Sequence, residues 1–323
     1  MIPFFVVDRP VSLEILKGVF LEFPNLKFGL MTHANVSPNF IQVFRAFPYK
    51  TSLKYLDDEE HRINEATVNK QLKNNIIKMA DSGAFQKNGS IKTYQQLFNT
   101  YLSLGVHFGI IKDVLHNMNA TIESAKEAMD IYDKLELHDK FSLIGVAQGR
   151  TTEEYVKCYS QLLDLGYEYI AIGGLLKRNG NSNYVQVRSE KFLKDVVIAI
   201  QNEFSPKWLF VLGVYNPRRH ALLNELGVWG ADYKGWLFHY DEYYSESIQE
   251  FLGYPDVKKA YNKFIYYKNK FRSNRTRENR TLFWHARKEL DSVLRSHGSS
   301  LQRLRFQEVR DAIKATIIPQ MKS

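Results

Sequence analysis

The chain has 323 residues and a formal net charge of +9, and 44% of its residues are hydrophobic, which excludes an intrinsically disordered protein. Cys158 is the only cysteine, so a disulfide framework and a cysteine-cluster zinc site are also excluded. Residues 1–10 lack the basic and apolar regions of a signal peptide, and no apolar run is long enough to predict a membrane span. We therefore expect a cytoplasmic protein without membrane contact.

Eight short apolar runs alternate with longer segments, most of which have a helical pattern. The predicted strands are residues 3–8, 27–31, 75–80, 107–113, 141–149, 169–175, 208–214 and 230–236. The clearest predicted helices are residues 120–135, 151–166, 188–204 and 217–227. This alternation predicts an α/β fold, a TIM-type (β/α)8 barrel, with a doubly wound open sheet as the alternative.

The chain divides near residue 254. Residues 1–254 carry the strand–helix alternation, whereas residues 255–323 read as a basic, aromatic and mostly helical extension. Within the barrel, residues 32–70 form an unusually long connection without a clear pattern beyond a short helical stretch. Long connections of this kind are often functional.

The positive charge lies almost entirely in the extension. Residues 251–323 contain 17 Lys and Arg against six Asp and Glu, a net charge of +11, whereas residues 1–250 contain 27 against 29, a net charge of −2. Such a segment can be an ordinary solvated helical surface. The other interpretation is a nucleic-acid-binding surface in which basic side chains contact phosphates and aromatic rings stack on bases. The candidates for these contacts are Lys268, Lys270, Arg272, Arg275, Arg277, Arg280 and Arg287.

Polar residues and glycines follow several predicted strands at their carboxyl ends. They are Asp81, Asp113, Gln148, Gly173, Gly174 and Asp232. In a (β/α)8 barrel these strand ends converge on one face, where the site is built from several strands. Two aspartates there can act as nucleophile and as general acid/base. Taken singly, each residue is more often a helix cap, a turn or a solvent-facing side chain.

Taken together, these segments resemble the tRNA-guanine transglycosylase superfamily. DSGAFQ (81–86) is similar to its DSGGFQ signature, GVAQG (145–149) to GIVQG, and IAIGGL (170–175) to YAIGGL. ELGVWGADYKG (225–235) occupies the place of its nucleophile segment. The order and spacing of the segments agree over about residues 75–240.

The resemblance implies a base exchange in which a purine is replaced by a 7-deazapurine without cleavage of the nucleic-acid backbone. Asp232 matches the nucleophile that attacks C1′ of the target guanosine, and Asp81 matches the general acid/base. The positions that match base-binding residues are Ser82, Gly83, Phe85, Asp113, Gln148, Gly173, Gly174 and Leu175. A carboxylate nucleophile suits this reaction because it can stabilise an oxocarbenium-like centre as a covalent glycosyl intermediate.

The chain departs from the tRNA enzymes after the nucleophile. Asp232 is followed by Tyr-Lys-Gly, and residues 233–323 contain no cysteine, so the CxCxxC zinc motif of those enzymes is missing. We therefore expect no metal and no cofactor, the 7-deazaguanine base being a substrate. With these departures, the chain is most similar to the DpdA-type DNA-guanine transglycosylases. These are bacterial or phage enzymes related to queuosine biosynthesis that insert 7-deazaguanines into DNA.

The leading hypothesis is thus a DNA-guanine transglycosylase of the bacterial cytoplasm, or of the host cytoplasm if phage-encoded. The partners it implies are duplex or locally opened DNA, a base such as 7-cyano-7-deazaguanine, and other DNA-modification proteins. One alternative is a zinc-free tRNA- or RNA-guanine transglycosylase. A second, from another class, is a non-catalytic barrel that binds nucleic acid or serves as an accessory subunit.

Overall fold

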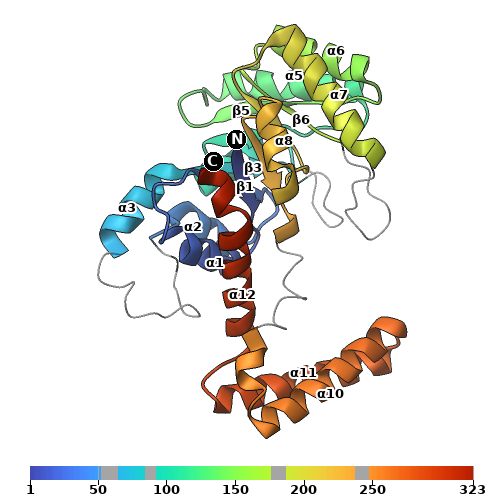
Figure 1. Cartoon of the computed structure of the whole chain (residues 1–323). Coiled ribbons are helices and arrows are strands. Elements are labelled where there is room, and N and C mark those ends of the chain that lie inside the picture. The colour runs from blue at the N-terminus through green and yellow to red at the C-terminus, as the bar shows by residue number, and fades with distance from the viewer. Residues whose placement is uncertain (50, 52–64, 84–91, 176–186, 237–246, 323) are drawn as a thin grey trace.

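The computed structural model describes residues 1–49, 51, 65–83, 92–175, 187–236 and 247–322 (Figure 1). Its centre is a closed barrel of parallel strands in which each strand pairs with the next along the chain, and the last pairs with the first. The strands are β1 (Ile2–Val6), β2 (Phe28–His33), β3 (Ile76–Asp81), β4 (Phe108–Ile110), β5 (Ser142–Ala147), β6 (Tyr169–Ile172), β7 (Leu209–Val211) and β8 (Gly230–Tyr233). The (β/α)8 prediction is confirmed, because the β1–β8 pairing excludes an open sheet.

Helices form the outer layer around the barrel. They are α1 (Pro10–Phe20), α2 (Pro38–Ala46), α3 (Glu65–Asn75), α4 (Tyr94–Leu104), α5 (Met118–Lys134), α6 (Thr152–Asp164), α7 (Val187–Phe204) and α8 (His220–Glu225), the last preceded by the 3₁₀ helix η2 (Pro217–Arg219). Side-chain caps start several of them: Thr151 accepts a hydrogen bond from the Glu154 amide at α6, and Thr93 forms a capping box with Gln96 at α4.

Helix α2 corrects the expectation of an unpatterned connection over residues 32–70. Ser37 caps this helix through the Phe40 amide, and Pro38 occupies its first turn, which is a standard start signal that the sequence contains. Phe40 and Phe44 bury its apolar face against the barrel core. The helical stretch predicted beyond it, at residues 50–56, falls almost wholly outside the described residues.

Aromatic rings fill the interior of the barrel near the amino ends of its strands. Phe4 packs on Phe210 and Trp229, with ring centroids 5.0 and 5.6 Å apart, and Phe108 lies 5.5 Å from Trp208. This half of the barrel is therefore a packed core, as in other barrels of this type. We therefore expect a site within the barrel toward the carboxyl ends of the strands.

The chain continues beyond the barrel as helices. They are the 3₁₀ helix η4 (Ile248–Phe251), α10 (Pro255–Ser273), α11 (Arg277–Ser296), α12 (Leu301–Thr316) and α13 (Ile318–Lys322). Helices α10 and α11 pack along each other as a hairpin around a second hydrophobic cluster that includes Val257, Phe264 and Leu290. No helix in the part of the chain that the structure describes is long and apolar enough to cross a bilayer.

Helix α12 joins the hairpin to the barrel. Its first turn contributes Leu301 and Leu304 to the hairpin cluster, whereas Val309 and Ile313 belong to the barrel core. Near its end, Lys314 forms an ion pair with Glu22, which follows α1 at the amino-terminal face of the barrel. The start of α12 therefore points toward the opposite face, and Figure 1 shows the hairpin beyond the carboxyl ends of the strands.

Gly29 on β2 is a sensitive position in the barrel interior. A Cβ atom there would lie 2.1 Å from the ring of Phe4, so Gly29→Ala should lower the free energy of unfolding by about 1–3 kcal/mol through overpacking. Urea denaturation measures the change. The control is Gly253→Ala, where no atom lies within 4 Å of the added Cβ. Equal stability of the two variants would contradict this account of the interior.

Candidate active site

The carboxyl ends of the strands bring the predicted catalytic and base-binding residues to one mouth of the barrel. Asp81 is the last residue of β3, Asp232 lies on β8, and Gln148 and Gly173 directly follow β5 and β6. Asp113 follows β4 by three residues. The charge of Asp81 raises the pKa of both Asp113 and Asp232, which shows that the three acids share one electrostatic environment.

Asp113 and Gln148 form a buried hydrogen-bonded pair. The Gln148 Nε2 donates to Asp113 Oδ2 at 2.6 Å, and its Oε1 accepts from the His116 amide at 3.2 Å. These contacts orient the side-chain amide, so the remaining carboxylate oxygen of Asp113 is presented in a defined direction. Burial, followed by the charge of Asp81, raises the pKa of Asp113 to about 7.

The two glycines after β6 let the backbone approach this pair closely. A Cβ at Gly173 would lie 2.5 Å from Gln148 Nε2, and one at Gly174 would lie 2.5 Å from Gln148 Oε1. Gly174 also has a φ of +71°, which disfavours any other residue. From outside the barrel, the hydroxyl of Tyr155 on α6 donates to the Gly173 carbonyl at 2.7 Å and fixes the turn.

Asp232 is 7% exposed and its carboxylate is held by the chain that leaves β7. The amide of Gly213 donates to Asp232 Oδ1 at 2.5 Å, and the Tyr215 amide donates to the Asp232 carbonyl at 3.2 Å. Arg219 holds the same loop through the Val214 carbonyl at 2.7 Å. Burial raises the pKa of Asp232 to about 6, although the Gly213 hydrogen bond opposes the shift.

Asp81 lies among the first residues of the DSGAFQ segment. The amides of Ser82 and Gly83 and the Ser82 hydroxyl hydrogen-bond its carboxylate, yet burial outweighs them and raises its pKa. Gly83 has a φ of +74°, and its carbonyl accepts from Asn35 Nδ2 at 3.3 Å. The next predicted base contact, Phe85, lies outside the described residues. Leu175 is buried in the barrel core.

The structure adds two ionisable residues that the sequence did not single out. His33 ends β2 directly opposite Asp81 in the β2–β3 register, and Lys234 follows β8 two residues after Asp232. Residues two apart on a strand face the same way. The charge of Lys234 lowers the pKa of Asp81, Asp232 and His33, so its ammonium reaches this side of the mouth.

The mouth thus has two chemically different halves. The β8–β1–β2–β3 side carries Asp232, His33, Asp81 and Lys234, which are groups suited to nucleophilic attack and proton transfer. The β4–β5–β6 side carries Asp113, Gln148 and the glycine turn, which offer hydrogen-bond donors and acceptors. In the described part of the chain, no three His, Cys, Asp or Glu side chains are grouped as metal ligands.

The predicted nucleic-acid-binding residues lie elsewhere, on the hairpin. Lys268, Lys270 and Arg272 are on α10, Arg275 is in the connection, and Arg277, Arg280 and Arg287 are on α11. Most are exposed, and helical spacing places Lys268, Arg272, Arg280 and Arg287 on one side of the hairpin but not the other three.

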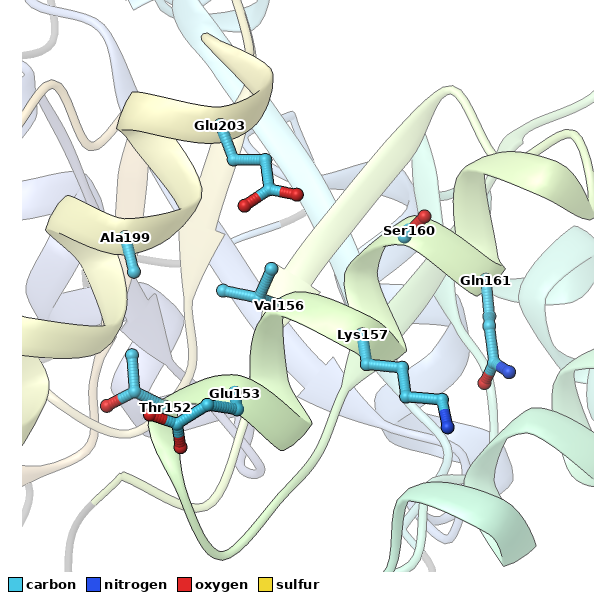
Figure 2. Close-up of a pocket in the computed structure, with 8 residues that line it drawn as sticks. All are labelled: Thr152, Glu153, Val156, Lys157, Ser160, Gln161, Ala199 and Glu203. Carbon is cyan, nitrogen blue, oxygen red and sulfur yellow. The ribbon is translucent and has the colours of Figure 1, made fainter.

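A surface groove with a volume of about 640 Å³ lies between α6 and α7 (Figure 2). Its lining includes Glu153, Lys157, Gln161 and Glu203, which belong to the outer helical layer. The groove contains none of the strand-end residues, so it is separate from the barrel mouth.

Comparison with models of known protein families and with curated protein sequences found no match to this chain. The geometry of the mouth and the sequence motifs are therefore the basis for a functional proposal.

The raised pKa of Asp113 has a consequence for stability. Asp113 ionises near pH 4 in the unfolded chain but near pH 7 in the folded protein. Its stabilising contribution to folding is therefore fully present below about pH 4 and is lost as the pH rises through 7. Asp113→Asn removes this loss. The difference in free energy of unfolding, variant minus wild type, should become more positive between pH 4.5 and pH 8 in urea titrations.

The control for this titration is Asp195→Asn, on the exposed surface of α7. Its difference from the wild type should stay constant over the same range. A difference that stays constant for Asp113→Asn as well would contradict the raised pKa.

Proposed function

We propose that this protein is a DNA-guanine transglycosylase that exchanges guanine in DNA for a 7-deazaguanine base through a covalent aspartyl-glycosyl intermediate. The observation that carries the proposal is that two acids, the partly buried Asp81 and the buried Asp232, lie with the Asp113–Gln148 pair at the same barrel mouth. The proposal is supported by the fact that Asp81, Asp113, Gln148, Gly173 and Asp232, which match family positions in the sequence, lie at or just after the carboxyl ends of their strands.

In the proposed first step the Asp232 carboxylate attacks C1′ of the target nucleotide, and the C1′–N9 bond breaks as guanine leaves with the electron pair. The leaving base requires a proton. Asp81 can supply it, because burial raises its pKa and keeps more of it protonated. Asp81 is then a carboxylate and accepts the N9 proton of the incoming base, whose N9 attacks C1′ and releases Asp232. Protons and charges balance over the cycle.

Base recognition falls to the other half of the mouth. Guanine and 7-deazaguanine both present an N1–H and a 2-amino group. The two oxygens of one carboxylate can accept hydrogen bonds from both of these donors. Asp113 is the acceptor for this edge, and Gln148 orients it through the 2.6 Å hydrogen bond. Gly173 and Gly174 support this arrangement because a Cβ at either position would collide with the Gln148 amide that orients Asp113.

The proposal of DNA rather than RNA as substrate draws on the basic hairpin and on the missing zinc motif. The extension carries a net charge of +11, which suits a polyanion. The target base must leave its stack to reach acids buried in a barrel mouth, which costs a few kcal/mol. A surface that binds the DNA strand beside the barrel can offset this cost.

Asp232→Asn tests the nucleophile. The variant should fold normally and lose incorporation of labelled guanine into DNA, by at least about a thousandfold, together with any covalent protein–DNA adduct. Asp195→Asn should behave as the wild type. Retained exchange in Asp232→Asn would remove this residue as nucleophile. Labelling of tRNA but not DNA would favour the RNA enzyme, and labelling of neither would favour the non-catalytic barrel.

The pH dependence of exchange tests the environment of the nucleophile. Because Asp232 must be ionised and its pKa is raised to about 6, kcat/KM should increase with pH through about 6. Lys234 lowers this pKa, so Lys234→Gln should move the rising limb to higher pH. Lys207→Gln, at an exposed position before β7, is the control. An unchanged limb in Lys234→Gln would contradict this role.

A further inference from the structure

The basic residues of the hairpin divide between its two sides. Phe264 on α10 and Ala286 and Leu290 on α11 lie in the contact between the helices. Each residue advances about 100° around a helix, so Lys263 and Glu289 leave this contact on the same side. Their ion pair across the hairpin, 2.6 Å long, confirms this assignment.

The opposite side of the hairpin carries a different set of residues. Arg280, Trp284 and Arg287 follow the i, i+4, i+7 spacing of one helix face, and Lys268 and Arg272 follow the i, i+4 spacing on α10. In an antiparallel pair, residues turned in the same sense from the contact lie on the same side. We call this set of five the Trp284 face. The acids Glu278 and Glu289 turn the other way. Asp291 follows Arg287 by four residues on the same side, but it forms an ion pair with Arg295 at 3.0 Å, so positive charge predominates on the Trp284 face.

Trp284 is held at the centre of this face with much of its ring accessible. It is 42% exposed, whereas Trp208, Trp229 and Trp236 belong to the barrel or pack against it. The Arg287 guanidinium lies 5.0 Å from the centroid of its ring, and Phe283 packs on its edge at 5.6 Å. Phe283 in turn stacks on Phe271 of the other helix, so the indole has a firm support.

We propose that the Trp284 face binds single-stranded DNA next to the target nucleotide, with Trp284 stacking on an unpaired base and the basic side chains contacting phosphates. This inference rests on the proposed function and names the form of the substrate that the hairpin holds. Phosphate contacts alone would serve duplex DNA equally well. An accessible aromatic ring between arginines is instead the combination that single-strand-binding surfaces use.

The position of the hairpin supports the same conclusion. It lies beyond the carboxyl ends of the strands, on the side of the barrel mouth (Figure 1). The α12 segment that connects them is anchored at both ends, by the hairpin cluster and by the barrel core. A strand opened for base exchange would therefore meet the hairpin on the same side of the protein as the catalytic acids.

The chain offers a matched control for Trp284. Tyr266 on α10 is 61% exposed and packs on the edge of Tyr267 at 5.1 Å, so it is another supported, accessible ring. By helical spacing it lies away from the Trp284 face. Loss of Tyr266 should leave single-strand binding unchanged if the position of the ring matters, and should reduce it if any exposed aromatic ring suffices.

Titration of the full-length protein with a thymidine oligonucleotide tests the proposal. Stacking should quench the fluorescence of Trp284, and single-stranded DNA should bind more tightly than a duplex of the same length. Trp284→Ala should abolish the quenching and weaken single-strand binding by about tenfold or more, without changing its salt dependence. Arg280→Ala should instead reduce the slope of log K against log salt by about 0.7, while Tyr266→Ala should match the wild type.

Equal affinity for single strand and duplex, or unaltered binding by Trp284→Ala, would overturn the inference. Tighter binding of an RNA oligonucleotide would overturn the choice of DNA. Exchange of labelled guanine on an oligonucleotide with an unpaired target separates the two proposals. If Trp284→Ala exchanges guanine as well as the wild type, the role of the hairpin is refuted and the transglycosylase proposal is not. If DNA quenches the fluorescence of Trp284 but no Asp232-dependent exchange occurs, the transglycosylase proposal is refuted and the hairpin role is not.

Discussion

The structure depends on one electrostatic constraint, the burial of three carboxylates within a nearly neutral barrel. Asp81, Asp113 and Asp232 each have a raised pKa, and burial is the largest cause in every case. Ionised acids are costly to bury unless hydrogen bonds or opposite charges offset the cost. Backbone amides at Gly213, Gly83 and Ser82, the Gln148 amide and the Lys234 ammonium provide this offset. Their unequal distribution makes the three acids different from one another.

This inequality allows acids of one type to perform different tasks. Asp232 receives a short amide hydrogen bond and has a pKa near 6, so it is largely ionised at neutral pH. Asp113 has a pKa near 7 and a fixed amide partner, which suits recognition. Asp81 raises the pKa of both, so the protonation of any one acid affects the other two. The mouth behaves as a coupled unit rather than as three independent groups.

In the proposed reaction, the barrel carries the chemistry and the hairpin carries the DNA binding. Positive charge is concentrated in the extension, away from the buried acids, so it does not suppress the proton affinity on which the proposed acid step depends. Helix α12 maintains the geometry, because its two halves belong to two different hydrophobic clusters. In the proposed complex, this connection would hold a DNA strand beside the mouth, because α12 packs on both clusters.

Much of this architecture follows from local sequence patterns. Alternating apolar runs and capped helices predict the strand–helix order, but only the β1–β8 pairing distinguishes a closed barrel from an open sheet. The positions at the ends of the predicted strands pointed to Asp81, Asp113, Gln148, Gly173 and Asp232, because parallel strands bring their carboxyl ends together. Partners that are distant in the chain cannot be read from such patterns. Only the tertiary structure shows that the Gly213 amide hydrogen-bonds Asp232 and that His33 and Lys234 lie near the acids. It also shows that the basic residues of the hairpin lie on different sides of it. These relations depend on barrel closure and on the rotation of each helix about its axis. Both bring together residues that are far apart in the sequence, so sequence spacing does not reveal the contacts.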